Sequence, residues 1–223
     1  MRYFFTRDNV SLAVEGGCAA RRDLAQREGF EISKLTCAEQ VHGVDVAVVD
    51  EALVGCGALD LESRIPKSDA MITNIKGVCL MILTADCVPV LLHDKRKGVI
   101  AAIHAGWKGT AGRIVKKSIE KMAEVYGCDI RDIEAYIGPS ICGRCFEVGN
   151  EVVAAIGERY VTGESENGKA LLDLKYANTI QMTEMGIDLS NIKVSHECTY
   201  HDRLASWRRE KCVERIGSGI WLE

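Results

Sequence analysis

Two continuous apolar runs near the middle of the chain dominate its hydrophobic pattern. They cover residues 78–83 and 98–103, and both are typical of strands buried on two faces. The first run leads into a polar turn that ends at Cys87, and the second run ends at His104. Because side chains at strand ends often converge on a ligand, we expect Cys87 and His104 to take part in the chemistry of this protein.

Helical periodicity lies on both sides of these runs. One helix is predicted from Trp107 to about Tyr126, and another from Gly16 to Gly29, where the final glycine is typical of a helix C-cap. Helical periods also cover residues 150–160 and 171–185. The chain therefore carries several amphipathic helices that need a partner surface.

Shorter apolar or alternating runs predict further strands at residues 3–14, 36–41, 44–49, 69–74, 133–137, 192–194 and 215–222. Helices and strands alternate irregularly, and the sequence has no convincing repeat of 20–50 residues. This pattern predicts an α+β, or mixed α/β, fold. Hydrophobic residues make up 47% of the 223 residues, enough for one sizeable core, so we expect a single domain that covers residues 1–223.

The charge and cysteine content narrow the class of protein. The formal net charge is −4 and there is no polybasic run, so we expect no nucleic-acid partner and favour a small or metal-bound ligand. No apolar run approaches 18 residues, and the first ten residues are too short and polar for a signal peptide. The ten cysteines are scattered along the chain, so we expect a cytoplasmic protein, not bound to membranes, with most of its thiols reduced and packed in the core.

A third turn carries another possible metal ligand. His42 lies in the tetrad QVHG, at a sharp bend between the apolar runs 36–41 and 44–49. His42, Cys87 and His104 form a possible ligand set, because catalytic zinc is commonly held by three side chains with a fourth position left open. The three residues are far apart in the sequence, so packing roles in the core or in loops remain the alternative.

Several charged residues near these turns are possible catalytic or phosphate-binding groups. Asp86, next to Cys87, is interpreted as a general acid or base, as a group that orients the site, or as a turn cap. Lys108 lies at a glycine-bearing helix start that suits an anion, and Arg208, Arg209 and Arg215 have guanidinium groups that suit phosphate. Solvated surface positions are the alternative for all four basic residues. The sequence has no Walker motif and no Gly-x-Gly-x-x-Gly after a strand.

The remaining cysteine and histidine motifs are interpreted as structural. Cys142 and Cys145 form a Cys-x-x-Cys pair, but no second pair accompanies it and the context of a redox motif is missing. The signature of zinc-dependent nucleobase deaminases is also absent. We therefore predict that Cys142 and Cys145 are dispensable for catalysis. His93 is predicted to end a strand, and His196 is expected to line a site in preference to His201.

Six motifs are more specific than these patterns: QVHG at 40–43, DAMITN at 69–74, TADCVPV at 84–90, HAGWKGT at 104–110, GPSICGRCFEV at 138–148 and SWRR at 206–209. Together they resemble the YfiH-like family, whose members are called purine nucleoside phosphorylases and, in older usage, laccase-domain or polyphenol oxidase proteins. The resemblance covers about Thr36 to the C-terminus. Members usually carry an Asn-Arg pair in the first helix, where this chain has Ala20-Arg21.

The resemblance implies a four-layer α-β-β-α sandwich and a zinc site formed by His42, Cys87 and His104. It also implies phosphorolysis of adenosine, inosine and S-methyl-5'-thioadenosine, with deamination of adenosine at the same centre, so purine nucleosides and phosphate are the expected partners. Zinc would polarise water or substrate, while Lys108 or an arginine near the C-terminus would offset the charge of phosphate. We expect a monomer or a weak homo-oligomer.

Three other functions fit part of the pattern. A cysteine hydrolase would use Cys87 as nucleophile and His104 as base without a metal. A copper-dependent polyphenol oxidase would place copper instead of zinc in the site, but it would normally need more histidine than the five present. A non-enzymatic interaction module would use zinc only for stability.

Overall fold

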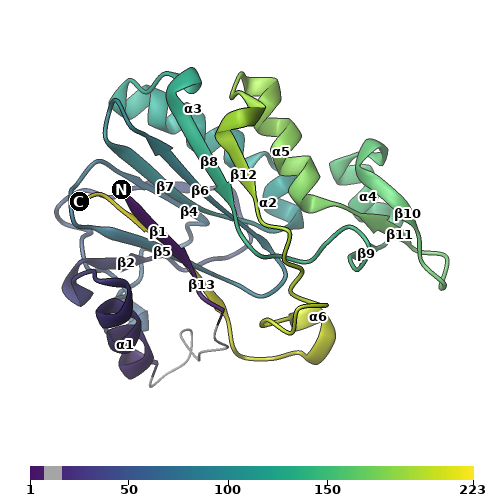
Figure 1. Cartoon of the computed structure of the whole chain (residues 1–223), viewed down its shortest axis with the longest axis horizontal. Coiled ribbons are helices and arrows are strands. Elements are labelled where there is room, and N and C mark those ends of the chain that lie inside the picture. The colour runs from purple at the N-terminus through teal and green to yellow at the C-terminus, as the bar shows by residue number, and fades with distance from the viewer. Residues whose placement is uncertain (8–16) are drawn as a thin grey trace.

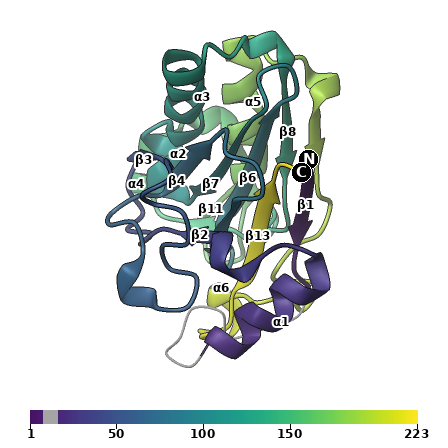
Figure 2. The same cartoon turned by 90° about the vertical axis from the view of Figure 1, so that its left-hand side faces the viewer.

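The computed structural model describes residues 1–7 and 17–223, and it confirms the mixed α/β fold. Its main part has four layers, with one helix, a four-stranded sheet, a six-stranded sheet and a second helical layer stacked in that order (Figures 1 and 2). This arrangement is the α-β-β-α sandwich that the resemblance implies.

The four-stranded sheet has the order β1-β13-β5-β2. Its strands are β1 (Arg2–Phe5), β13 (Ile216–Trp221), β5 (Cys79–Thr84) and β2 (Leu35–Cys37). β2 runs parallel to β5, and the other neighbours are antiparallel. Helix α1 (Cys18–Glu28) covers the outer face and ends at Gly29, whose φ of 81° gives the left-handed cap that the sequence predicts.

The six-stranded sheet has the order β12-β8-β6-β7-β4-β3. Its strands are β12 (Ile192–Val194), β8 (Ile133–Ile137), β6 (Val88–Asp94), β7 (Val99–Ala105), β4 (Ala70–Thr73) and β3 (Val46–Val48). Helices α3 (Ile114–Tyr126) and α5 (Leu174–Met185) pack on its outer face (Figure 1). Because both faces are covered, the central strands β6 and β7 are buried along their whole length and are mostly apolar.

Alternation along the central strands explains the two apolar runs. In β6, Leu91 faces the other sheet while Val90 and Leu92 face the helices. In β5, Leu80 and Ile82 pack between the sheets while the intervening residues face α1. Successive side chains of each strand thus face opposite sides of the sheet, and both sides are apolar. The two sheets therefore form three apolar layers, one between them and one against the helices on each outer face.

A smaller unit extends from one end of the sandwich (Figure 1). It contains a three-stranded sheet, in the order β10-β11-β9, and helix α4 (Asn150–Ile156). The strands are β9 (Glu147–Val148), β10 (Val161–Glu164) and β11 (Ala170–Leu172). Two short helices, α2 (Trp107–Ala111) and α6 (Trp207–Glu210), complete the helices of the described residues. Five single 3₁₀ turns cover residues 32–34, 61–63, 130–132, 158–160 and 189–191.

Three predicted helices differ from the structure, and the strands predicted at 3–14 and 36–41 are shorter, as β1 ends at Phe5 and β2 at Cys37. The helix predicted at 107–126 is divided into α2 and α3, because Arg113 has a φ of 61° and a Cβ at Gly112 would lie 2.5 Å from Val44 Cγ1. The helix predicted at 150–160 ends before Gly157, whose φ is 123°. The helix predicted from 171 begins only at Leu174, after a short strand. The predicted strand at 3–14 is observed as β1, and its part at 8–14 lies outside the described residues, as does Gly16.

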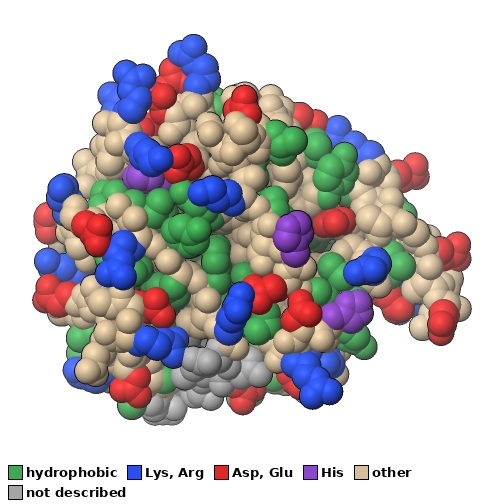
Figure 3. All heavy atoms as spheres, viewed as in Figure 1, with side chains coloured by type: hydrophobic (Ala, Val, Ile, Leu, Met, Phe, Trp, Pro, Cys, Tyr) green, Lys and Arg blue, Asp and Glu red, His purple; other side chains and the backbone are tan. Residues whose placement is uncertain are grey.

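The ten cysteines are all free, but only Cys37, Cys79, Cys128 and Cys198 are buried, so the expectation that most are packed in the core is wrong. Acidic and basic side chains are interspersed over the face in Figure 3. Among the described residues, no helix has the length and apolar character that a membrane span requires.

Candidate functional site

The predicted site lies where the chain crosses between the two sheets. β5 ends in the four-stranded sheet at Thr84, and β6 begins in the six-stranded sheet at Val88, so Cys87 lies on the crossing. β6 pairs with β7 in a register that places Pro89 opposite His104. This register brings the half-buried Cys87 and the buried His104 to the same end of the six-stranded sheet.

A second crossing between the sheets brings His42 to the same place. The QVHG tetrad connects β2 to β3, and His42 adopts a φ of 60° at the turn. The Gln40 side chain donates a hydrogen bond to the Leu83 carbonyl at 2.7 Å and accepts one from the Leu83 N–H at 2.8 Å. These two bonds fasten the His42 turn to the end of β5, close to the crossing that carries Cys87.

Asp69 organises two of these three residues at once. Its buried carboxylate accepts a hydrogen bond from His104 Nδ1 at 2.7 Å and others from the backbone N–H groups of His42 and Gly43 at 3.0 and 2.7 Å. Burial would raise the pKa of Asp69, but the bonds from His104 and Gly43 outweigh it and lower the pKa. The sequence analysis gave this residue no role, although it stands directly before a buried strand.

The three side chains form a set that fits one metal ion. The ligand atoms of His42, Cys87 and His104 all lie within 4.8 Å of one another. Gly106 keeps the space beside them open, because a Cβ there would lie 3.1 Å from Cys87 Sγ and 3.3 Å from His42 Cδ2. With Nδ1 of His104 engaged by Asp69, Nε2 is the nitrogen left for a metal, an arrangement that is common for metal-bound histidine.

The electrostatics of the set favour a deprotonated thiol. Burial would raise the pKa of the Cys87 thiol, but its hydrogen bonds with His104 and His42 outweigh burial and lower the pKa to about 6. Burial would lower the pKa of His104, but its bonds with Asp69 and Cys87 raise the pKa to about 9. A thiolate is both the metal-binding form and the nucleophilic form of cysteine, so the set can serve either chemistry.

We predict that Asp69→Asn weakens metal binding at this set by about 10- to 100-fold, because an amide holds the His104 ring and the His42 turn less firmly. Metal affinity measured by competition with a chromogenic chelator tests this. Asp45→Asn, an exposed change in the connection between β2 and β3 that carries His42, is the matched control and should leave the affinity unchanged. Equal affinities in the two variants would contradict the role given to Asp69.

A cavity of about 540 Å³ opens beside the set. This volume lies within the range of about 300–1,000 Å³ that small-molecule sites occupy. Its lining includes His42, Cys87 and His104, three aromatic residues and four arginines, namely Trp107, Phe146, Trp207, Arg21, Arg64, Arg208 and Arg215. The cavity therefore combines a possible metal centre with flat apolar surfaces and positive charge.

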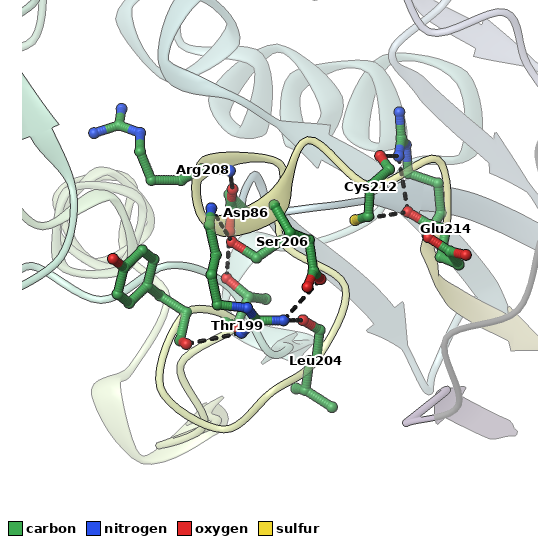
Figure 4. Close-up of polar contacts among 11 residues, drawn as sticks. Asp86, Thr199, Leu204, Ser206, Arg208, Cys212 and Glu214 are labelled. Carbon is green, nitrogen blue, oxygen red and sulfur yellow. Dashed lines mark hydrogen bonds and ion pairs between the residues drawn. The ribbon is translucent and has the colours of Figure 1, made fainter.

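The arginines of the cavity are held by backbone carbonyl groups. Arg208 donates from one terminal nitrogen to the Glu147 carbonyl at 2.9 Å. Arg215 donates to the carbonyl groups of Cys212 and Glu214, which are labelled in Figure 4. Among the described residues, no carboxylate forms an ion pair with either guanidinium. Arg21 is buried and donates to the Ala58 carbonyl at 2.7 Å. Arg208 and Arg215 thus line the cavity, and no described carboxylate is paired with either guanidinium group.

Two basic residues of the predicted phosphate site lie elsewhere. Lys108 is exposed on the five-residue helix α2, with Nζ 5.7 Å from the centre of the Trp107 ring, and it does not line the cavity. The Arg209 guanidinium donates to the carbonyl groups of Thr199, Tyr200 and Leu204. It therefore supports the loop before α6 and has little capacity left for phosphate.

Asp86 connects the Cys87 turn to this same loop. One carboxylate oxygen accepts a hydrogen bond from Thr199 Oγ1 and the other from the Arg208 N–H, both at 2.6 Å (Figure 4). The residue has a φ of 86°, a value that aspartate tolerates better than most residues. Asp86 thus holds the first turn of α6, and with it Arg208, beside the cavity.

A second group of side chains that could hold a metal ion changes the interpretation of Cys142 and Cys145. Cys142 and Cys145 do have partners, because Cys198 and His201 place their ligand atoms within 4.8 Å of the pair and of each other. The expectation that His196 would line a site in preference to His201 is also wrong, because of these two histidines His201 belongs to such a group among the described residues and His196 does not. His93 is the last residue but one of β6, as the prediction of a strand-end residue implies.

Comparison with known proteins agrees with this architecture. A family model described as multi-copper polyphenol oxidoreductase laccase matches residues 10–223. The chain belongs to this YfiH-like, laccase-domain family. The match begins well before Thr36, so the resemblance extends further toward the N-terminus than the six motifs indicate.

Curated members of the YfiH-like family carry enzyme names. The chain is 38% identical to "Adenosine deaminase RL5" of an unknown prokaryotic organism over 81% of this chain and 71% of that protein. It is 38% identical to a purine nucleoside phosphorylase of Bacteroides thetaiotaomicron, over 82% and 71% of the two chains. A purine nucleoside phosphorylase of Streptomyces coelicolor is 37% identical over 93% and 84%. These names support an enzyme.

Solved structures of the YfiH-like family share the fold. The crystal structure of the Bacillus licheniformis hypothetical protein YfiH superposes with a TM-score of 0.90 at 27% identity, covering 96% of this chain and 85% of that one. The structure of YlmD from Geobacillus stearothermophilus gives a TM-score of 0.85 at 33% identity, covering 93% and 80%.

Proposed function

We propose that this YfiH-like protein is a zinc-dependent purine nucleoside phosphorylase that acts on adenosine, inosine and S-methyl-5'-thioadenosine and also deaminates adenosine. The observation that carries the proposal is the group of His42, Cys87 and His104 at the wall of a cavity that is also lined by Arg208 and Arg215, two arginines that form no ion pair with a described carboxylate. Relatives named purine nucleoside phosphorylase and adenosine deaminase support both activities.

The donor set suits zinc. One thiolate and two imidazoles are ligands that zinc accepts, and three protein ligands leave a position open to the cavity. A zinc ion held there supplies Lewis-acid chemistry, because it polarises oxygen ligands and lowers the pKa of water toward about 7. Asp69 fixes the ring of His104 and the backbone of the His42 turn, so two of the three ligands keep their positions when substrate enters.

The cavity walls suit the two substrates of the reaction, phosphate and the purine nucleoside. Phosphorolysis joins a phosphate oxygen to the anomeric carbon of the ribose and breaks its bond to the purine. Arg208 and Arg215 bind and orient the phosphate, because guanidinium groups match its geometry and offset its charge. Trp107, Phe146 and Trp207 provide flat apolar surfaces for a purine ring.

Asp86 acts here as a positioning residue. Both of its carboxylate oxygens already accept hydrogen bonds from the loop that carries Arg208, so it holds that arginine near the substrate. This engagement of both oxygens supports a positioning role over that of a general acid or base. We place the protein in the cytoplasm, which its ten free cysteines support.

A cysteine hydrolase is the second candidate. The geometry that favours it is the chain of contacts from Cys87 to His104 to Asp69, which resembles a nucleophile, a base and an orienting acid. A copper-dependent polyphenol oxidase, which the family description suggests, has less support, because only two of the five histidines lie in the cavity.

The decisive experiment incubates the pure protein with each nucleoside, with and without phosphate, and identifies the products by mass spectrometry. Free purine and ribose phosphate that form only with phosphate establish phosphorolysis, and conversion of adenosine to inosine establishes deamination. The absence of both products, with zinc bound and the chain folded, would refute the proposed function.

A further inference from the structure

We propose that Cys142, Cys145, Cys198 and His201 bind a second zinc ion, which has a structural role and joins two loops beside the cavity. The inference is independent of the proposed catalytic activity, because it rests on a different set of side chains. We call these four residues the Cys₃His cluster.

The geometry of the Cys₃His cluster fits one ion. The three sulfur atoms and one imidazole nitrogen all lie within 4.8 Å of one another. Cys145 Sγ lies 3.4 Å from His201 Nε2, and the Cys142 N–H donates to Cys198 Sγ at 3.3 Å. Zinc with bonds of about 2.3 Å to sulfur holds tetrahedral ligand atoms about 3.8 Å apart, so a small contraction completes the site.

The composition of the cluster distinguishes it from the set in the cavity. Three thiolates and one imidazole supply all four ligands of a tetrahedral zinc, which is the composition of structural zinc sites. His42, Cys87 and His104 supply only three ligands and leave a position open. The Cys₃His cluster therefore supplies a full set of four ligands, which suits a zinc ion that stabilises the fold. The set in the cavity leaves one coordination position open.

The backbone holds the two halves of the cluster together before any metal binds. Ser140 and Cys198 form an isolated parallel bridge, and the Thr199 N–H donates to the Ser140 carbonyl at 3.2 Å. The Asp202 side chain accepts a hydrogen bond from the Cys198 N–H at 2.7 Å. These contacts bring together residues that are more than 50 positions apart, so the ligand positions follow from the fold.

The surroundings of the cluster also suit an anionic zinc–thiolate group. Zinc with three thiolates carries one net negative charge. The buried Lys175 ammonium donates to the carbonyl groups of Ser195 and Glu197, in the loop that leads to Cys198. Its positive charge lies beside this loop and offsets the charge of the cluster.

A metal in the Cys₃His cluster would stabilise one wall of the cavity. Ile141, which lines the cavity, directly precedes Cys142. Thr199 directly follows Cys198 and donates to Asp86, which in turn accepts the N–H of Arg208. Zinc in the cluster therefore fixes the loops that position Arg208 without touching substrate.

Elemental analysis of protein purified from zinc-supplemented cells, without chelators, tests the inference. We expect two zinc ions per chain in the unmodified protein and the loss of one in the double variant Cys142→Ser/Cys145→Ser. His196→Ala, an exposed histidine in the same loop as His201, is the matched control and should retain both. His42→Ala should lose only the other ion.

The outcomes separate this inference from the proposed function. A single zinc that the double variant loses and His42→Ala keeps supports the cluster and overturns the cavity site. A single zinc with the opposite behaviour overturns the cluster. A disulfide between Cys142 and Cys145 in protein purified without added oxidant also overturns it.

A second measurement applies if the double variant does not fold. In the unmodified protein, bound zinc should protect Cys142 and Cys145 from an alkylating reagent, and removal of zinc by a chelator should expose them. Cys212 is half-buried and outside the cluster, so its alkylation should not change. Equal alkylation of the pair with and without zinc overturns the inference.

Discussion

Replacing Cys87 with serine is expected to remove zinc from the cavity site and to lower phosphorolysis and deamination together by at least about 10²- to 10³-fold. The magnitude corresponds to the loss of one essential electrostatic contributor to a transition state. Serine has nearly the same size, but its hydroxyl stays protonated near neutral pH, and metal ligands of this kind must be deprotonated. The zinc content per chain and kcat/KM for both reactions are the measurements.

Cys18→Ser is the matched control, because Cys18 is a half-buried cysteine on α1 outside both metal-binding groups. It should keep the full zinc content and full activity. Full zinc content in an inactive Cys87→Ser variant would instead favour Cys87 as a nucleophile. The cysteine hydrolase would then be supported further by wild-type activity that survives chelation and disappears on alkylation.

The site residues predicted from the sequence were those that end strands. Cys87 and His104 could be chosen because each follows an apolar run, and the structure confirms both runs as β5 and β7. His42 could be chosen because QVHG interrupts two such runs. Local patterning thus located three residues, but it could not show that two crossings between sheets bring them together.

The residues that sequence reasoning missed depend on long-range packing. Asp69 acts on His104 and on the His42 turn, residues 35 and 27 positions away. Arg64 lies in the long loop at residues 51–67, whose glycines and proline indicate a loop but do not single out this arginine. Cys198 and His201 join the Cys142 pair only through the bridge between two loops. No spacing rule predicts these contacts, because each is set by sheet order.

The predicted helix boundaries were wrong for a related reason. Periodicity continues from Trp107 to Tyr126, yet the helix is interrupted at Arg113, whose φ of 61° is left-handed. The preceding Gly112 lies against Val44, where a Cβ would be 2.5 Å from Val44 Cγ1, so this turn packs on a segment far away in the sequence. Local periodicity does not report such a contact. Lys108, on the short helix α2, is exposed and does not line the cavity.

Because Lys108 lies outside the cavity and Arg215 lines it, we expect the two residues to differ in their effect on phosphate binding. Arg215→Gln should raise the KM for phosphate by about 10- to 100-fold, which corresponds to the loss of one charged hydrogen-bonding group worth about 1.5–3 kcal/mol. Deamination of adenosine should be largely unchanged, because its second substrate is water. Lys108→Ala, an exposed basic residue near the same site, should alter neither reaction. Initial rates across a phosphate series for both variants give the comparison.

Two further variants make this test specific to phosphate. Arg215→Lys keeps the charge but loses the planar fork, so its KM for phosphate should lie between those of the wild type and Arg215→Gln. Arg208→Gln should also raise this KM, because Arg208 lines the same cavity and forms no ion pair with a described carboxylate. If Arg215→Gln lowered both activities in parallel, its bonds to the Cys212 and Glu214 carbonyls would explain the loss as structural. If only Lys108→Ala changed the phosphate dependence, phosphate would bind at α2, and the arginines of the cavity would have another ligand.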